Sequence, residues 1–111
     1  MQTVMLDSNI FDRLDKDEAA QNSLRIARKN EQIRIVISPD IHRELEQGRF
    51  RGVPPFFPVV VVKDSAAAKA RHADIFVSES QHSRDRLQAA SKACACMSYE
   101  QFSQWVTTLP Q

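Results

Sequence analysis

Glycine is scarce in this chain, with only 2 among 111 residues. Enzymes that bind nucleotides on a glycine-rich loop need several glycines at fixed spacing, and neither a Walker pattern nor a dinucleotide-binding pattern occurs here. Aromatic side chains are also few, at 7% of the chain with a single Trp. A surface on which nucleic-acid bases stack is therefore not expected.

Cysteine, net charge and long apolar runs are limited too. Cys94 and Cys96 have no second pair that would complete a zinc site, so we predict reduced, structural thiols. A net charge of +1 means that any basic surface must be local. No apolar run approaches the ~20 residues that span a membrane. Residues 1–3 lead directly into a predicted strand, without the features of a secretory leader. We therefore expect a cytoplasmic protein with no membrane partner.

What the chain does contain is a regular alternation of strand and helix patterns. Its length predicts a single domain over residues 1–111. Four consecutive valines, at 59–62, predict a strand that is buried on both faces. The element order β-α-α-β-α-β-α-β-α-β-α predicts a parallel sheet with helices on both faces. The expected strands cover residues 3–6, 33–37, 59–62, 75–77 and 93–97, and the expected helices cover about 9–14, 17–29, 38–48, 65–71, 82–92 and 98–109.

Acidic residues follow three of these strands. Asp7 comes after the first strand and Asp64 after the third, while Glu79 follows the fourth between Ser78 and Ser80. Because the carboxyl ends of parallel strands lie at one edge of a sheet, we expect these side chains to converge. Each aspartate also stands where a helix begins, so helix capping alone would explain either one.

Glu44 adds a fourth acid from the helix after the second strand. It lies three positions from Ile41 and next to Leu45, which define that helix's apolar stripe, so we expect Glu44 on or beside the buried face. A carboxylate there is costly unless it meets a cation. Clustered carboxylates suit a hard divalent cation such as Mg²⁺ or Mn²⁺, and such a site suits phosphodiester hydrolysis.

Four segments resemble the motifs of PIN-domain ribonucleases. VMLDSNIF is similar to that family's opening strand, which ends on Asp, Ser or Thr, and Asn. IVISPDIHREL resembles its second motif, with a Glu five residues after the Pro. KDSAAAKARHADIFVSES resembles its third and fourth motifs, and MSYEQFSQWV resembles its closing strand and helix. The resemblance covers nearly the whole chain.

The resemblance implies a three-layer α/β/α sandwich with a central, mainly parallel five-stranded sheet, and cleavage of RNA with Mg²⁺ or Mn²⁺. By motif match, Asp7, Glu44 and Asp64 are the catalytic, metal-holding residues, and Glu79 is a further candidate ligand. Many small bacterial members are toxins neutralised by an antitoxin protein, and many dimerise. The implied partners are thus RNA, an antitoxin and a second copy. Three residues near the acids are assigned to substrate positioning: Asn9, Ser78 and Ser80.

Two departures from the family are visible. Glu44 and Asp64 lie only 20 positions apart, where the family usually has a helical hairpin that helps to build the substrate groove and the dimer face. This gap permits another register with Asp74 as the third acid; we prefer Asp64, because Asp74 enters the next strand from its amino end. In addition, Ser80 stands where the fourth motif usually has Asp.

Local basic charge gives modest support for a polyanionic ligand. We assign Arg49, Arg51, Lys69 and Arg71 to the RNA backbone, and a mixed solvated surface is the alternative. Lys63, Arg84 and Arg86 could belong to the same backbone-contacting surface.

Three functional hypotheses follow from the sequence. The first is a metal-dependent endoribonuclease, and the second is a catalytically reduced PIN-like module that binds RNA or a protein. A phosphate-ester hydrolase or receiver-like domain is the third, but the acidic pair that a receiver needs near its first strand is absent.

Overall fold

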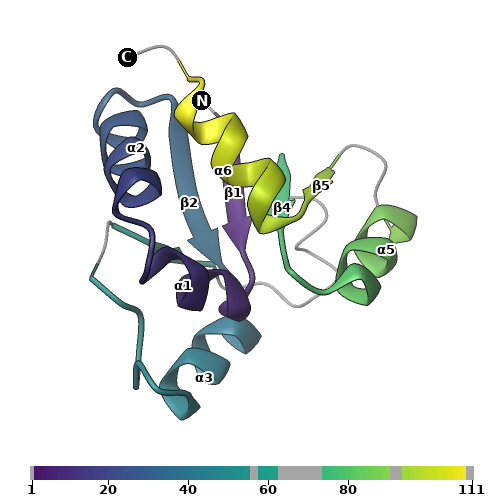
Figure 1. Ribbon diagram of the computed structural model, residues 1–111. Helices are drawn as coiled ribbons and strands as arrows, with labels where there is room; N and C mark the ends of the chain where they lie inside the picture. Colours follow the sequence, from purple (N-terminus) through teal and green to yellow (C-terminus); the bar gives the residue numbers. More distant parts are fainter. Residues whose placement is uncertain (1, 56–57, 63–73, 91–93, 110–111) are drawn as a thin grey trace.

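A five-stranded parallel sheet forms the centre of the protein in the computed structural model, which describes residues 2–55, 58–62, 74–90 and 94–109 (Figure 1). The strands are β1 (Gln2–Leu6), β2 (Ile33–Ile37), β3 (Val60–Val61), β4 (Ile75–Val77) and β5 (Ala95–Met97). The sheet order is β3-β2-β1-β4-β5 and every neighbouring pair is parallel. The predicted parallel α/β class is therefore confirmed.

The described helices begin where the sequence provides capping residues. Asp17, Ser38 and Ser98 accept hydrogen bonds from backbone N–H groups in the first turns of α2, α3 and α6. None of the described helices is long and apolar enough to cross a membrane. The expected helix over 65–71 lies outside the described residues. The helices that the structure describes are α1 (Ser8–Leu14), α2 (Glu18–Lys29), α3 (Pro39–Gln47), α5 (Gln81–Ala90) and α6 (Tyr99–Thr107).

The helices cover the sheet in two layers, which gives a three-layer α/β/α architecture. The chain leaves β1 through α1 and α2 to reach β2 on one side, and leaves β4 through α5 to reach β5 on the other. Right-handed crossovers that run in opposite directions place their helices on opposite faces. After β5 the chain returns, and α6 packs against α2 (Figure 1).

The central strands β1, β2 and β4 are mostly buried on both faces. Val4, Met5 and Leu6 of β1 are fully buried, and all three residues of β4 are buried. In β2 only Arg34 is exposed. Each buried aliphatic side chain contributes about 1.5–3 kcal/mol relative to an exposed one. The strongest packing therefore surrounds β1, next to the edge where Asp7 stands.

The valine run at 59–62 is not buried on both faces, so that prediction was wrong. Val60 and Val61 are 45% and 40% exposed. β3 is an edge strand of the described sheet and pairs there on one side only, with Val36 and Ile37 of β2. An uninterrupted apolar run has the same sequence appearance in a central strand and in an edge strand, and only the sheet order separates the two.

Candidate functional site

A cleft of about 900 Å³, lined by both polar and apolar side chains, lies at the carboxyl edge of the sheet. β1 and β4 are neighbours, and the connections that follow them leave in opposite directions. Ligands of open α/β sheets bind at such a topological switch point. The cleft is lined by residues of the β1–α1 junction, α3 and α5, among them Asp7, Ser8, Asn9, Glu44, Ser80 and Arg86.

Asp7 is both a helix cap and a wall residue of this cleft. Its Oδ1 accepts a hydrogen bond from the backbone N–H of Ser8 at 2.8 Å, as the N-cap of α1. Its Oδ2 accepts a hydrogen bond from the hydroxyl of Ser78, also at 2.8 Å. Two carboxylate oxygens have about four lone-pair positions, so two remain for a ligand. The capping interpretation is therefore correct for Asp7 and leaves it able to bind a cation.

Glu44 reaches Asp7 through Ser8. The Ser8 hydroxyl donates to Glu44 Oε2 at 2.5 Å, while the Ser8 backbone N–H donates to Asp7. Glu44 is exposed in the cleft, so the expectation that it lies on a semi-buried face was wrong, although Ile41 and Leu45 form the buried stripe as predicted. The side chain of Glu44 points away from the apolar stripe, so that its carboxylate lies in the cleft. Ser8 had no assigned role from the sequence, and its position between Asp7 and Asn9 was the available signal.

The third acid of the predicted set cannot come from position 74. The carboxylate of Asp74 accepts a hydrogen bond from the backbone N–H of Thr3 at 2.8 Å, at the amino end of β1. Asp7 lies four positions after Thr3 along this strand, a distance of roughly 13 Å. The register with Asp74 as a ligand is therefore excluded. Asp64 lies outside the described residues.

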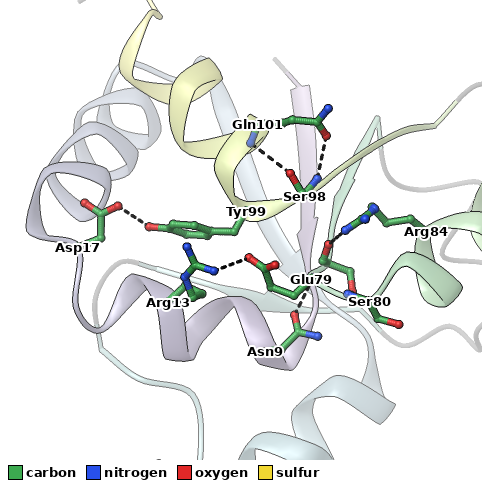
Figure 2. A network of polar contacts seen from close by, with 10 residues as sticks. Asn9, Arg13, Asp17, Glu79, Ser80, Arg84, Ser98, Tyr99 and Gln101 are labelled. Carbon is green, nitrogen blue, oxygen red and sulfur yellow. Dashed lines mark hydrogen bonds and ion pairs between the residues drawn. The ribbon is translucent and has the colours of Figure 1, made fainter.

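Glu79 is turned away from the cleft. Its carboxylate forms an ion pair with Arg13 at 3.0 Å, and Figure 2 shows it directed toward Arg13 and away from Ser80. The guanidinium of Arg13 also lies 4.8 Å from the ring centroid of Tyr99, whose hydroxyl donates to Asp17 at 2.6 Å (Figure 2). Glu79 thus belongs to a structural network, and its assignment as a further metal ligand does not fit this placement.

The residues assigned to substrate positioning do surround Asp7. The hydroxyl of Ser78 is fully buried and accepts from the Ser80 backbone N–H at 3.1 Å while it donates to Asp7. The Ser80 hydroxyl accepts from the Ser83 backbone N–H at 3.2 Å, which caps α5. Asn9 Oδ1 accepts from the backbone N–H of Glu79 at 3.2 Å (Figure 2). Asn9 and Ser80 line the cleft, and Ser78 holds Asp7 from behind it.

Arg49 is engaged within the protein, contrary to its assignment to the RNA backbone. Its guanidinium donates to Asp12 at 2.8 Å and to Asp15 at 2.9 Å, and it lies over the ring of Phe50. The hydrogen bonds to Asp12 and Asp15 raise the pKa of Arg49. Arg51 is exposed and does not line the cleft. Lys69 and Arg71 lie outside the described residues.

The donor set of the cleft fits a hard divalent cation with few protein ligands. No group of three or more His, Cys, Asp or Glu that could hold a metal occurs among the described residues. Asp7 and Glu44 nevertheless present two linked carboxylates in one cleft. Mg²⁺ commonly keeps several waters and binds through one or two carboxylates together with substrate phosphate oxygens. Two carboxylates therefore suffice for that mode of binding.

Comparisons with known proteins returned no match: no family model, no curated protein and no solved structure is significantly similar to this chain.

Proposed function

We propose that this protein is a PIN-like, metal-dependent endoribonuclease. The observation that carries the proposal is the contact between two motifs that are distant in the sequence. Asp7 and Glu44 come from segments 37 positions apart, and Ser8 hydrogen-bonds both of them in one cleft. Capping of α1 explains Asp7 alone, but it does not explain why a second carboxylate reaches the same serine.

Asp7 and Glu44 would hold Mg²⁺ or Mn²⁺, with Asp64 as the third acid that the family resemblance implies. When bound, such an ion lowers the pKa of a coordinated water and stabilises negative charge on a phosphoryl group. The protein's own residues orient the two carboxylates: Ser78 donates to Asp7, and Ser8 donates to Glu44. Hydrogen bonds of this kind to ligand residues typically support metal affinity or activity by about 10–100-fold.

A catalytically reduced PIN-like module that binds RNA or a protein is the second candidate. The observation that favours it is the missing acid at the fourth motif. Ser80 lines the cleft there, and the neighbouring Glu79 is paired with Arg13 outside it. A cleft with fewer carboxylates holds a cation more weakly, and binding without cleavage is the expected result.

The biological setting that we propose follows from the same resemblance. A small PIN-like domain suits the toxin of a toxin–antitoxin pair, which acts on cytoplasmic RNA and is neutralised by a cognate antitoxin. A homodimer belongs to this proposal as well. Purification of the chain with the product of a neighbouring gene tests the antitoxin, and the oligomeric state in solution tests the dimer.

The deciding experiment compares cleavage of single-stranded RNA by wild type, Asp7→Asn and Glu44→Gln with Mn²⁺ or Mg²⁺. Each variant should lose more activity than the roughly 10–100-fold that loss of a hydrogen bond supporting a metal ligand costs. Glu46→Gln is the matched control, because Glu46 is an exposed glutamate of the same helix that pairs with His42 outside the cleft. It should cleave as wild type does.

Two results would contradict the enzyme proposal. Cleavage that survives both cleft substitutions would place the chemistry elsewhere or in a contaminant. Absence of wild-type cleavage with either metal, together with retained RNA binding, would favour the reduced module.

A further inference from the structure

The wall of the cleft formed by α5 carries three polar side chains at helical spacing. Ser80, Ser83 and Arg86 all line the cleft. Residues three apart lie on the same side of a helix, so these side chains form one continuous stripe. Asp7 and Glu44 line the cleft from the β1–α1 junction and from α3. The cleft thus combines acidic residues from one part of the chain with a polar, basic stripe from another.

Arg86 differs from the other arginines near this cleft in the described part of the chain. Arg43 is paired with Asp40 at 2.6 Å. Arg84 donates to the backbone carbonyl of Ser78 at 2.5 Å and to Gln81 at 2.6 Å. Arg86 is exposed, and it forms no hydrogen bond or ion pair with a described residue. Within the described part of the chain, none of the five N–H donors of its guanidinium is used, so that part leaves them open to a ligand.

We infer that Arg86 binds a backbone phosphate of the RNA, adjacent to the phosphodiester that reaches Asp7 and Glu44. This inference rests on the proposed function. A guanidinium matches the geometry of a phosphate and binds it through two parallel hydrogen bonds. A phosphate beside Asp7 and Glu44 needs a cation between itself and the two carboxylates. A phosphate beside α5 instead meets the positive charge of Arg86 directly. Arg86 therefore takes the role that the sequence assigned to Arg49, whose guanidinium is held by Asp12 and Asp15.

The contact between Arg86 and a phosphate positions the RNA and adds to its affinity, but it does not depend on the base sequence of the RNA. Contacts to phosphate fix the register of a nucleic acid on a protein but carry no base information. Binding through Arg86 should therefore weaken equally for RNAs of different sequence when the arginine is removed. It should also depend on salt, because each phosphate contact on a single strand releases about 0.7 of a counterion.

The test measures the affinity of a labelled single-stranded RNA for Glu44→Gln, Glu44→Gln/Arg86→Gln and Glu44→Gln/Arg28→Gln, by fluorescence anisotropy with Mg²⁺ at several KCl concentrations. The Glu44→Gln background prevents cleavage during titration. Arg28 is the matched control: it is an exposed arginine in the last turn of α2, at the opposite edge of the sheet. Removal of Arg86 should lower the salt slope by about 0.7. The corresponding affinity loss is about fivefold at 0.1 M salt and vanishes near 1 M.

A second measurement uses the cleavage reaction in the wild-type background. Arg86→Gln should raise KM more than it lowers kcat, because a contact to a neighbouring phosphate is present in the substrate complex as well as in the transition state. A thermal melt checks that the fold is intact. The substitution leaves the neighbouring Leu87, which is buried in the core, unchanged.

The outcomes separate this inference from the proposed function. A smaller salt slope for Arg86→Gln and an unchanged slope for Arg28→Gln support the phosphate contact. RNA binding with the same slope in all three proteins overturns the role of Arg86 and leaves the nuclease proposal standing. A wild type that neither binds nor cleaves RNA overturns the proposed function, and the inference with it.

Discussion

The hydroxyl of Ser78 is the support of Asp7 that can be removed with the smallest change to the protein. Ser78→Ala deletes one oxygen, which is fully buried. The backbone contacts of position 78 stay, including the hydrogen bond from its N–H to the Met97 carbonyl at 3.0 Å. The substitution therefore tests the contacts of the side-chain hydroxyl, to Asp7 and to the Ser80 backbone N–H, and leaves the backbone of position 78 as it was.

Two interactions are lost in this variant. The hydrogen bond to the Asp7 carboxylate at 2.8 Å involves a charged acceptor, and such bonds contribute about 1.5–3 kcal/mol. Asp7 is half-buried, so water replaces part of that contribution. The Ser80 backbone N–H also loses its acceptor at 3.1 Å. We expect the free energy of unfolding to fall by about 2 kcal/mol and the Tm to fall by roughly 8 °C in a domain of this size.

Urea denaturation followed by circular dichroism measures the change, and Ser83→Ala is the control. Ser83 lines the cleft and is half-exposed, so its substitution should stay within about 0.5 kcal/mol of wild type. If the free energy of unfolding of Ser78→Ala stays as close to wild type as that of Ser83→Ala, the Ser78 hydroxyl does not hold Asp7, and the proposed support of Asp7 by Ser78 is refuted.

Three further predictions concern the cleft and the structural network beside it. Ser80→Asp should tighten Mn²⁺ binding in calorimetry, because Asp adds a carboxylate to the cleft and caps a helix as well as Ser does; unchanged affinity would contradict the placement of residue 80 at the cation site. Tyr99→Phe should lower the free energy of unfolding by about 1.5 kcal/mol at pH 7, since its hydroxyl donates to Asp17 at 2.6 Å, and a variant as stable as wild type in urea would show that this bond contributes nothing. Burial raises the pKa of the Cys94 thiol to about 11, so the native state keeps a proton that the unfolded chain releases between about pH 9 and pH 11. The contribution of this thiol to the free energy of unfolding is therefore complete below about pH 9 and is lost as the pH rises toward 11. Urea midpoints at pH 8 and pH 11 should therefore differ less in Cys94→Ala than in wild type, and equal differences would contradict the assignment.

Much of the fold was predictable because its signals are local. Ser38, Pro39 and Gly48 predicted the bounds of α3, and short apolar runs predicted the strands β1 and β4. The same runs could not reveal position within the sheet. The valines at 59–62 have the composition of a central strand, yet β3 pairs on one side only.

The location of the candidate site could be predicted from the sequence, but the set of residues that form it could be predicted only in part. Asp7 and Glu44 stand on one cleft as expected, because the ends of parallel strands share an edge. Glu79 and Arg49 do not contribute to it, because Arg13 attracts the first and a pair of aspartates holds the second. Such partners come from distant segments, and no spacing in the sequence identifies them.

The sequence by itself therefore determined which elements form and which strand ends carry acids, since propensity, capping and apolar patterning act over a few residues. The tertiary structure alone decided where those acids point. It directed Glu44 to Ser8, placed Asp74 at the far edge, and turned Glu79 out of the cleft. The physical reason is that a side chain at the end of a strand follows the local turn of the backbone and the nearest opposite charge, and both depend on segments brought together only by folding.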